Sequence, residues 1–511
     1  MANSTSSEII SNGRQSNSIE EYTSIEDRLS SLSNPILIKI LSHLPILDAI
    51  KTSQLSRRWR NVWKGVTTFE FHTRTMKFEN AASLLLLLTS PTIRVFKYSY
   101  GHSTDYPYWK FRSAEHCYLS LIRRNIEVIQ ITSNNDDPIL VPVPDCVFNC
   151  ESLVDLDLSA CLDWTLKLDE VNDLPSNGTA INLPNLKKLR LRVNDFDYCL
   201  LRTLLKFCPV LEDLCLKLDL SNHNVPLEIV SPNLKSLDID MTVPAKCSDT
   251  VIDAPNLAKL KIRDPCSYYR FKTIPASLVE ASINFRCFED GEEVMDWSVQ
   301  DHARVSSKFI RGMSSVRYLK LHTYPNMHTY FGSEDDEVMP VFHNLTFFKT
   351  TMDTHEVWGN LLCTLHCFPN LKHLELKMDD FHISRRRFWC APIVLPDCLF
   401  TKLKRITMKN FKGTNDEIKL VEFILDHAKV LGELHIHAPT IIAYFKQTQL
   451  WEECKSCHAL FKLSKSFVTC KIVFSGVYIN ASSNAYKKGL IGCQIRCAEK
   501  LVDCEYYAMF R

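Results

Sequence analysis

The sequence is poor in glycine. Only 13 of its 511 residues are glycine, about 2.5%, where globular proteins usually have ~7%. Loops that cradle phosphates need glycines at fixed spacing, and no such motif occurs. The Gly-x-Ser-x-Gly and His-Glu-x-x-His motifs of hydrolases are also absent. We therefore expect no enzyme acting alone, no catalytic residue and no cofactor.

The sequence also lacks a net charge and a long apolar run. It has 60 Lys and Arg against 59 Asp and Glu, which argues against a nucleic-acid or membrane-surface partner. Its longest apolar run, Leu84 to Leu88, is far below the ~20 residues of a membrane helix. Residues 1–20 are polar and do not resemble a secretory signal. We therefore expect a cytoplasmic or nuclear protein whose 20 cysteines stay reduced.

The N-terminal part predicts a small helical docking module. Residues 1–23 are rich in Ser and Asn and are interpreted as a disordered lead. Asn34-Pro35 is a helix-start signal, and the pattern predicts three short helices between residues 24 and 70. The third is expected to place Leu55, Trp59, Val62 and Trp63 on one face. Since domains below ~40 residues usually need outside help, we expect one apolar face to be covered by a partner.

From about residue 120 a leucine-rich pattern recurs. Each unit has an apolar residue, two others, an apolar residue, one other and an apolar residue. The units begin at Ile126, Leu153, Leu186, Leu211, Leu234, Leu257, Leu278, Val316, Leu345, Leu371, Leu403 and Leu431. A Pro-Asn turn often comes first, as at Pro184-Asn185 and Pro255-Asn256. This pattern predicts one short strand per repeat, stacked into a solenoid.

Three stretches resemble plant F-box/FBD/LRR-repeat proteins. Residues 27–63, with Leu44-Pro45 and Arg57-Arg58-Trp59-Arg60, resemble the F-box, although Leu32-Ser33-Asn34 stands where the family has Leu-Pro-Asp or Leu-Pro-Glu. Cys208-Pro209-Val210-Leu211-Glu212 resembles the repeats, and the stretch from Leu395 to Ser475 resembles the FBD region. The resemblance implies an α/β fold: a three-helix F-box (24–70), an irregular leucine-rich-repeat solenoid (71–394) and an FBD region (395–475). Residues 476–511 stay an unassigned tail, and we expect a chain ending at Ser475 to keep its fold.

The resemblance implies a substrate-recognition subunit of an SCF-type ubiquitin ligase. The F-box would dock on a Skp-type adaptor and through it join a cullin, while the solenoid holds an unknown protein substrate. The alternative is a non-enzymatic binding scaffold without ligase activity. The residues implied to form the F-box core and its adaptor-facing surface are Leu32, Ile36, Leu37, Ile40, Leu41, Leu44, Pro45, Leu55 and Trp59.

Strand alternation predicts the substrate surface. Residues between the apolar points of each repeat should face outward, and their charge alternates in sign along the array, which favours a protein partner over nucleic acid. The candidate residues are Asp155, Asp157, Lys188, Arg190, Asp213, Asp238, Lys259, Lys261, Tyr318 and Lys320. We expect reversal of Lys188, Arg190, Lys259 and Lys261 to Glu to cost little stability.

Two other patterns are interpreted as structural. Cys454-x-x-Cys457 with His458 and later Cys470, Cys493 and Cys497 lacks two well-formed ligand pairs, so no metal site is predicted. The basic clusters at Arg57, Arg58, Arg60 and Lys64 and at Arg385 to Arg387 are interpreted as solvated surface.

Overall fold

The structure is a computed structural model. It describes residues 27–72, 76–86, 88, 92–101, 111–133, 139–164, 181–194, 198–219, 227–241, 249–264, 268–285, 306–323, 340–352, 358–378, 394–440, 446–463 and 470–483. The predicted lead (1–23), the cluster Arg385 to Arg387, and Cys493 and Cys497 lie outside these residues. The chain divides into two compact units, Met1–Thr67 and Thr68–Arg511.

The first unit is helical, as predicted. It contains α1 (Asn34–Leu41), α2 (Ile46–Lys51) and the 3-10 helices η1 (Thr52–Gln54) and η2 (Trp59–Gly65). The residue that caps α1 is Ser33, one position before the predicted Asn34, and its side chain makes no capping hydrogen bond. Leu55 differs from the prediction as well, because it lies between η1 and η2, is 66% exposed and does not share the buried face of Trp59, Val62 and Trp63.

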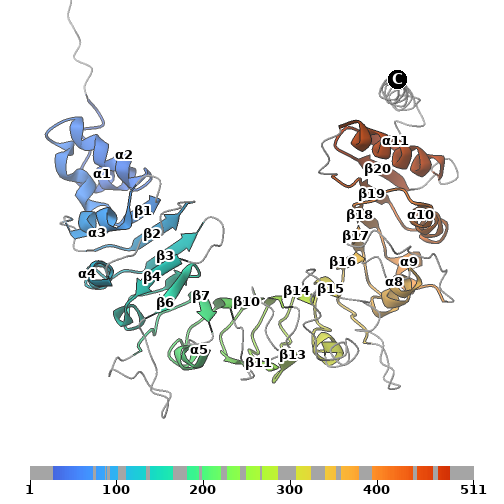
Figure 1. The fold of residues 1–511 in the computed structure, drawn as a ribbon, viewed down its shortest axis with the longest axis horizontal. Coiled ribbons are helices and arrows are strands. Elements are labelled where there is room, and N and C mark those ends of the chain that lie inside the picture. The colour runs from blue at the N-terminus through green and yellow to red at the C-terminus, as the bar shows by residue number, and fades with distance from the viewer. Residues whose placement is uncertain are drawn as a thin grey trace, which may run out of the picture. The chain divides into compact units, whose positions relative to one another are not determined.

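The second unit is built on a sheet of 16 strands (Figure 1). Its first strands are β1 (Thr68–His72), β2 (Val95–Tyr100), β3 (Val128–Ser133), β5 (Asp155–Leu158), β7 (Lys188–Asn194), β8 (Asp213–Asp219), β10 (Ser236–Met241) and β12 (Lys259–Arg263). The order continues with β14 (Glu280–Phe285), β15 (Tyr318–Thr323), β16 (Phe347–Met352), β17 (His373–Met378), β18 (Arg405–Lys409), β19 (Glu433–His437), β20 (Lys471–Ser475) and β21 (Asn480–Ser482). Neighbouring strands are parallel except β20 and β21.

The sheet confirms the repeat pattern. Each of the twelve predicted units supplies one strand, from β3 to β19, and the strands pair in register, as in Leu214 opposite Leu237 and Leu260 opposite Leu237. The apolar points of the pattern are buried, including Leu189 and Leu260. Because side chains alternate along a strand, the residues between them project to the other side, which we call the open face.

The three shortest repeats return through strands. The repeats that begin at Leu211, Leu234 and Leu257 are only 23, 23 and 21 residues long, and each contains one short return strand. These strands are β9 (Leu227–Val230), β11 (Asp249–Asp253) and β13 (Tyr268–Phe271), which form their own small sheet. Further strands β4 (Ile139–Val143) and β6 (Cys161–Trp164) pair with each other.

Several longer repeats return through helices. The described helices of the second unit include α3 (Phe78–Leu86), α4 (Phe111–Ile122), η3 (Asp145–Phe148), α5 (Tyr198–Lys206), α8 (Trp358–Thr364), η4 (Leu365–Cys367), α9 (Asp397–Thr401), α10 (Asn415–His427) and α11 (Lys446–Leu463), and residues 306–311 are helical as well. Figure 1 shows α8, α9 and α10 together on one side of the strands from β16 to β19. Helix α10 starts with a capping box formed by Thr414 and Glu417, so its first turn has its backbone donors satisfied.

The recurring Pro-Asn turn has a structural reason. The side chain of Asn256 donates to the carbonyl of Pro232 at 2.8 Å, and that of Asn233 donates to the carbonyl of Pro209 at 2.8 Å. Asn185 and Asn370 make the same contact with the preceding turn. Each asparagine therefore ties its repeat to the one before it.

Residues 476–483, which the sequence analysis assigned to no domain, contact the end of the sheet. Strand β21 pairs with β20. The carboxylate of Glu453 on α11 is 1% exposed and accepts backbone N–H groups from Val477 (2.8 Å), Tyr478 (2.9 Å) and Ile479 (2.9 Å). A chain ending at Ser475 would lose all three donors. The sequence did not indicate these contacts, because a single turn and one short strand leave no repeat pattern.

Candidate interaction surfaces

The F-box residues separate into a core and a surface. Leu37, Leu41 and Trp59 are buried, so they form the core of the first unit. The indole N–H of Trp59 donates to the hydroxyl of Ser30 at 2.8 Å, and the Arg58 guanidinium donates to the carbonyl of Leu32. Leu32 itself is half-buried. These contacts hold the segment before α1 against η2.

The remaining predicted residues form an exposed apolar set. Ile36 is 48% exposed, and Ile40 and Leu44 follow it at four-residue steps. Leu55 and Pro45 are exposed as well. Leu29, which precedes α1 and was not singled out from the sequence, is also exposed. We call Leu29, Ile36, Ile40, Leu44 and Leu55 the apolar set. So many exposed large apolar side chains in so small a unit indicate an interaction surface.

The open face of the sheet holds the predicted charges, and most of them neutralise one another. Lys261 donates to Asp238 at 2.5 Å, and Lys320 lies 3.4 Å from Glu280. Arg263 pairs with Asp240 in the same way. Since the strands are parallel and in register, a sign that alternates from repeat to repeat puts opposite charges side by side. Lys188 and Lys259 are exposed, and Asp213 is half-buried.

Arg190 is the centre of the most crowded group of charges. Its guanidinium lies 3.5 Å from Asp155, 3.8 Å from Asp157 and 3.8 Å from Asp213. Burial raises the pKa of Asp155, although the charge of Arg190 opposes the shift. Asp157 is only 7% exposed and accepts from the backbone N–H and the hydroxyl of Ser159. The sequence predicted only that these residues face outward. It did not indicate that Arg190 lies among three carboxylates or that Asp157 is buried.

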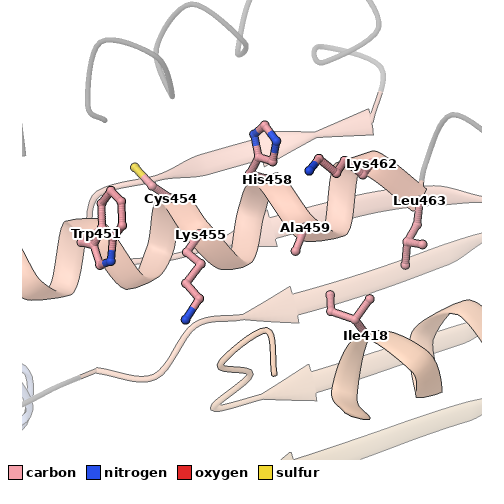
Figure 2. Close-up of a pocket in the computed structure, with 8 residues that line it drawn as sticks. All are labelled: Ile418, Trp451, Cys454, Lys455, His458, Ala459, Lys462 and Leu463. Carbon is pink, nitrogen blue, oxygen red and sulfur yellow. The ribbon is translucent and has the colours of Figure 1, made fainter. Parts of the chain in front are cut away.

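A groove lies between α10 and α11 (Figure 2). Its volume is about 460 Å³, and its lining includes Ile418 of α10 and Trp451, Lys455, Ala459 and Lys462 of α11. Trp451 is 40% exposed. The lining combines apolar surface with lysines, so the groove can accept an apolar side chain. The sequence analysis missed it, although Trp451, Lys455 and Ala459 recur at helical spacing.

The cysteines of the Cys454-x-x-Cys457 pattern lie in the apolar interior. Cys454 and Cys457 are buried in α11, and burial raises the pKa of Cys457 to about 12, which disfavours the thiolate that zinc needs. Within the described residues no group of three His, Cys, Asp or Glu side chains could hold a metal ion. In the same part of the chain, none of the helices combines the length and the apolar content needed to span a membrane.

Three family models match the chain, in the expected order. An F-box domain matches residues 29–70, the LRR repeats of "FBD-associated F-box protein At5g56370" match residues 115–282, and an FBD matches residues 392–436. The FBD match covers α9, β18, α10 and most of β19, so this region continues the sheet of the repeats.

Several similar proteins have names that mention these domains. From Arabidopsis thaliana, "Putative F-box/FBD/LRR-repeat protein At1g66290" is 26% identical over 88% of this chain and 93% of its own length. "F-box/FBD/LRR-repeat protein At4g26340" is 27% identical over 79% and 91%. "FBD-associated F-box protein At5g22730" is 25% identical over 81% and 88%. The comparisons confirm the resemblance that the sequence motifs indicated.

Proposed function

We propose, from the F-box, LRR and FBD domains of this chain, that it is the substrate-recognition subunit of an SCF-type ubiquitin ligase. The first unit docks on a Skp-type adaptor and through it on a cullin. The open face of the sheet holds a protein substrate. The chain contributes no catalytic group, since its part is to bring the substrate close to the ubiquitin carrier. This assembly would act in the cytoplasm or the nucleus.

The observation that carries the proposal is the apolar set. Ile36 and Leu55 are exposed although the core of the same unit is already formed by Leu37, Leu41 and Trp59. Large apolar side chains at the centre of an interface usually contribute most of its binding energy. An adaptor that covers the apolar set would remove this surface from water.

The test is capture of a purified Skp-type adaptor by the full chain. We expect the double variant Ile36→Asp, Leu55→Asp to weaken capture at least about tenfold, because both changes put a charge into the apolar contact. Ile274→Asp is the matched control, since Ile274 is 63% exposed in the second unit. It should leave capture unchanged.

Thermal melting of each variant shows whether the fold survives. Adaptor capture by the double variant at the wild-type level would contradict the docking proposal. A folded wild-type chain that captures no adaptor would instead favour the alternative, an LRR scaffold without ligase activity.

A further inference from the structure

Two aromatic side chains occupy one row of the open face. From β5 to β19 the first strand position carries polar or charged residues except at Tyr318 on β15 and Phe347 on β16. These two are opposite each other in register, with ring centroids 6.2 Å apart. Tyr318 is 48% exposed. A tyrosine and a phenylalanine on the solvent side of a sheet are typical of binding hot spots.

The strands that carry the aromatic pair and the two that follow, β15 to β18, place like charges side by side. Lys320 on β15 is in register with Lys349 on β16, and Lys377 on β17 with Lys409 on β18. Like charges directly opposite on neighbouring strands destabilise a sheet. The fold therefore keeps an arrangement that costs stability, next to the aromatic pair.

Acidic neighbours neutralise only part of this charge. Glu375 lies 2.7 Å from both Lys349 and Lys409, and Glu280 lies 3.4 Å from Lys320. Among the residues that the structure describes, four lysines against two glutamates leave two positive charges on these strands. Elsewhere Arg192 and Lys217 are also in register, but Arg192 is buried and donates to the carbonyl of Ser159. On β15 to β18, by contrast, all four lysines are half-buried on the open face and keep access to solvent.

We propose that this surface binds an acidic protein segment that carries an aromatic or large apolar side chain. We define the surface, the lysine-aromatic patch, as Tyr318, Phe347, Lys320, Lys349, Lys377 and Lys409. Carboxylates of the segment relieve the lysine pairs, and its apolar side chain covers Tyr318 and Phe347. The inference rests on the proposed function and names the class of substrate that the open face would select.

Fluorescence anisotropy with the full chain and three labelled synthetic peptides tests the patch. The first peptide is rich in Glu and Asp with one central Phe, the second has Ser in place of Phe, and the third has Lys in place of the acids. We expect the first to bind at least about tenfold more tightly than the others. Tyr318→Ala and Lys377→Glu should each weaken it about tenfold.

Lys206→Glu is the matched control, because Lys206 is exposed at the end of α5, outside the patch and outside the open face. It should bind the first peptide like the wild type, and all variants should melt normally. Equal effects of Lys377→Glu and Lys206→Glu, or equal binding of the acidic and the lysine peptides, would overturn the proposal. So would full competition by a DNA duplex of equal charge, which would indicate a general polyanion surface.

Adaptor capture is measured on the same samples, so that the two proposals fail separately. Peptide binding without adaptor capture would support the proposed patch and contradict the proposed ligase function. Adaptor capture without peptide binding would do the reverse.

Discussion

Glu453 is expected to hold the C-terminal end of the sheet in place. Its carboxylate is buried and accepts four hydrogen bonds: from the Gln449 side chain at 2.6 Å and from the backbone N–H groups of Val477, Tyr478 and Ile479 at 2.8, 2.9 and 2.9 Å. Each oxygen accepts two of them. A hydrogen bond to a charged group contributes about 1.5–3 kcal/mol. Removing the partners of a buried charge typically costs about 3–5 kcal/mol.

Two perturbations test this contact. Glu453→Gln keeps the shape of the side chain but turns one oxygen into an NH2 group that faces N–H donors, so we expect a loss of about 3–5 kcal/mol in local stability. Gly476→Ala should act similarly, because a Cβ at Gly476 would collide with the Glu453 carboxylate. Glu452→Gln is the control on the same helix, since Glu452 is half-buried beside Glu453.

A pair of truncations isolates the donors. A chain that ends at Ser475 lacks residues 477–479 and β21, whereas one that ends at Ser483 keeps them. Urea unfolding followed by tryptophan fluorescence is a suitable assay, because Trp451 lies on the same helix as Glu453. Hydrogen exchange at the amides of 477–479 gives the local measurement. Equal urea midpoints for the two truncations, or for Glu453→Gln and Glu452→Gln, would refute the reasoning.

Other residues give further tests of stability. Leu260→Ala should cost about 2–5 kcal/mol in denaturant unfolding, because Leu260 is fully packed in the repeat core. Arg190→Glu would place a fourth carboxylate among three aspartates and should cost about 1–3 kcal/mol, whereas Lys259→Glu should stay within about 0.5 kcal/mol. Asn256→Ala removes one inter-repeat hydrogen bond and should lower stability by about 1 kcal/mol. Burial opposes ionisation of Glu375, but bonds from two lysines lower its pKa below 4.5. The contribution of the ionised Glu375 carboxylate to the free energy of unfolding should therefore be complete above pH 4.5 and vanish as the pH falls through the lowered pKa. Glu375→Gln should flatten this part of a curve of stability against pH.

The repeat core could be predicted from the sequence because it depends on a local pattern. An apolar residue at a fixed position is enough to predict burial, and Leu153, Leu214 and Leu376 are all buried as expected. The role of Asn233 could not be predicted in the same way, because its partner is the carbonyl of Pro209 in the previous repeat. The Pro-Asn turn is visible in the sequence, but its hydrogen bond to the previous repeat follows only from how the repeats stack.

The F-box surface shows the same limit. Helical spacing identifies Ile36, Leu37, Ile40 and Leu41 as apolar, but it cannot say which of them face the core. Packing against η2 decides it, since Leu37 and Leu41 are buried and Ile36 and Ile40 are exposed. The short η1 and η2 helices also turn Leu55 away from Trp59, which a regular α-helical wheel does not reproduce.

On the open face, charges that alternate in sign between repeats pair mainly with each other. A sign that alternates from repeat to repeat suggests a partner with its own charge pattern, yet in a parallel, in-register sheet it mainly produces neighbours that neutralise each other, as in Lys261 and Asp238. The positions that indicate a binding site are those where two neighbouring repeats carry charges of the same sign. Lys377 beside Lys409 is such a position, and it lies on the strand next to Phe347. If a partner binds the open face, its acidic groups gain most where the protein has left its own charge uncompensated.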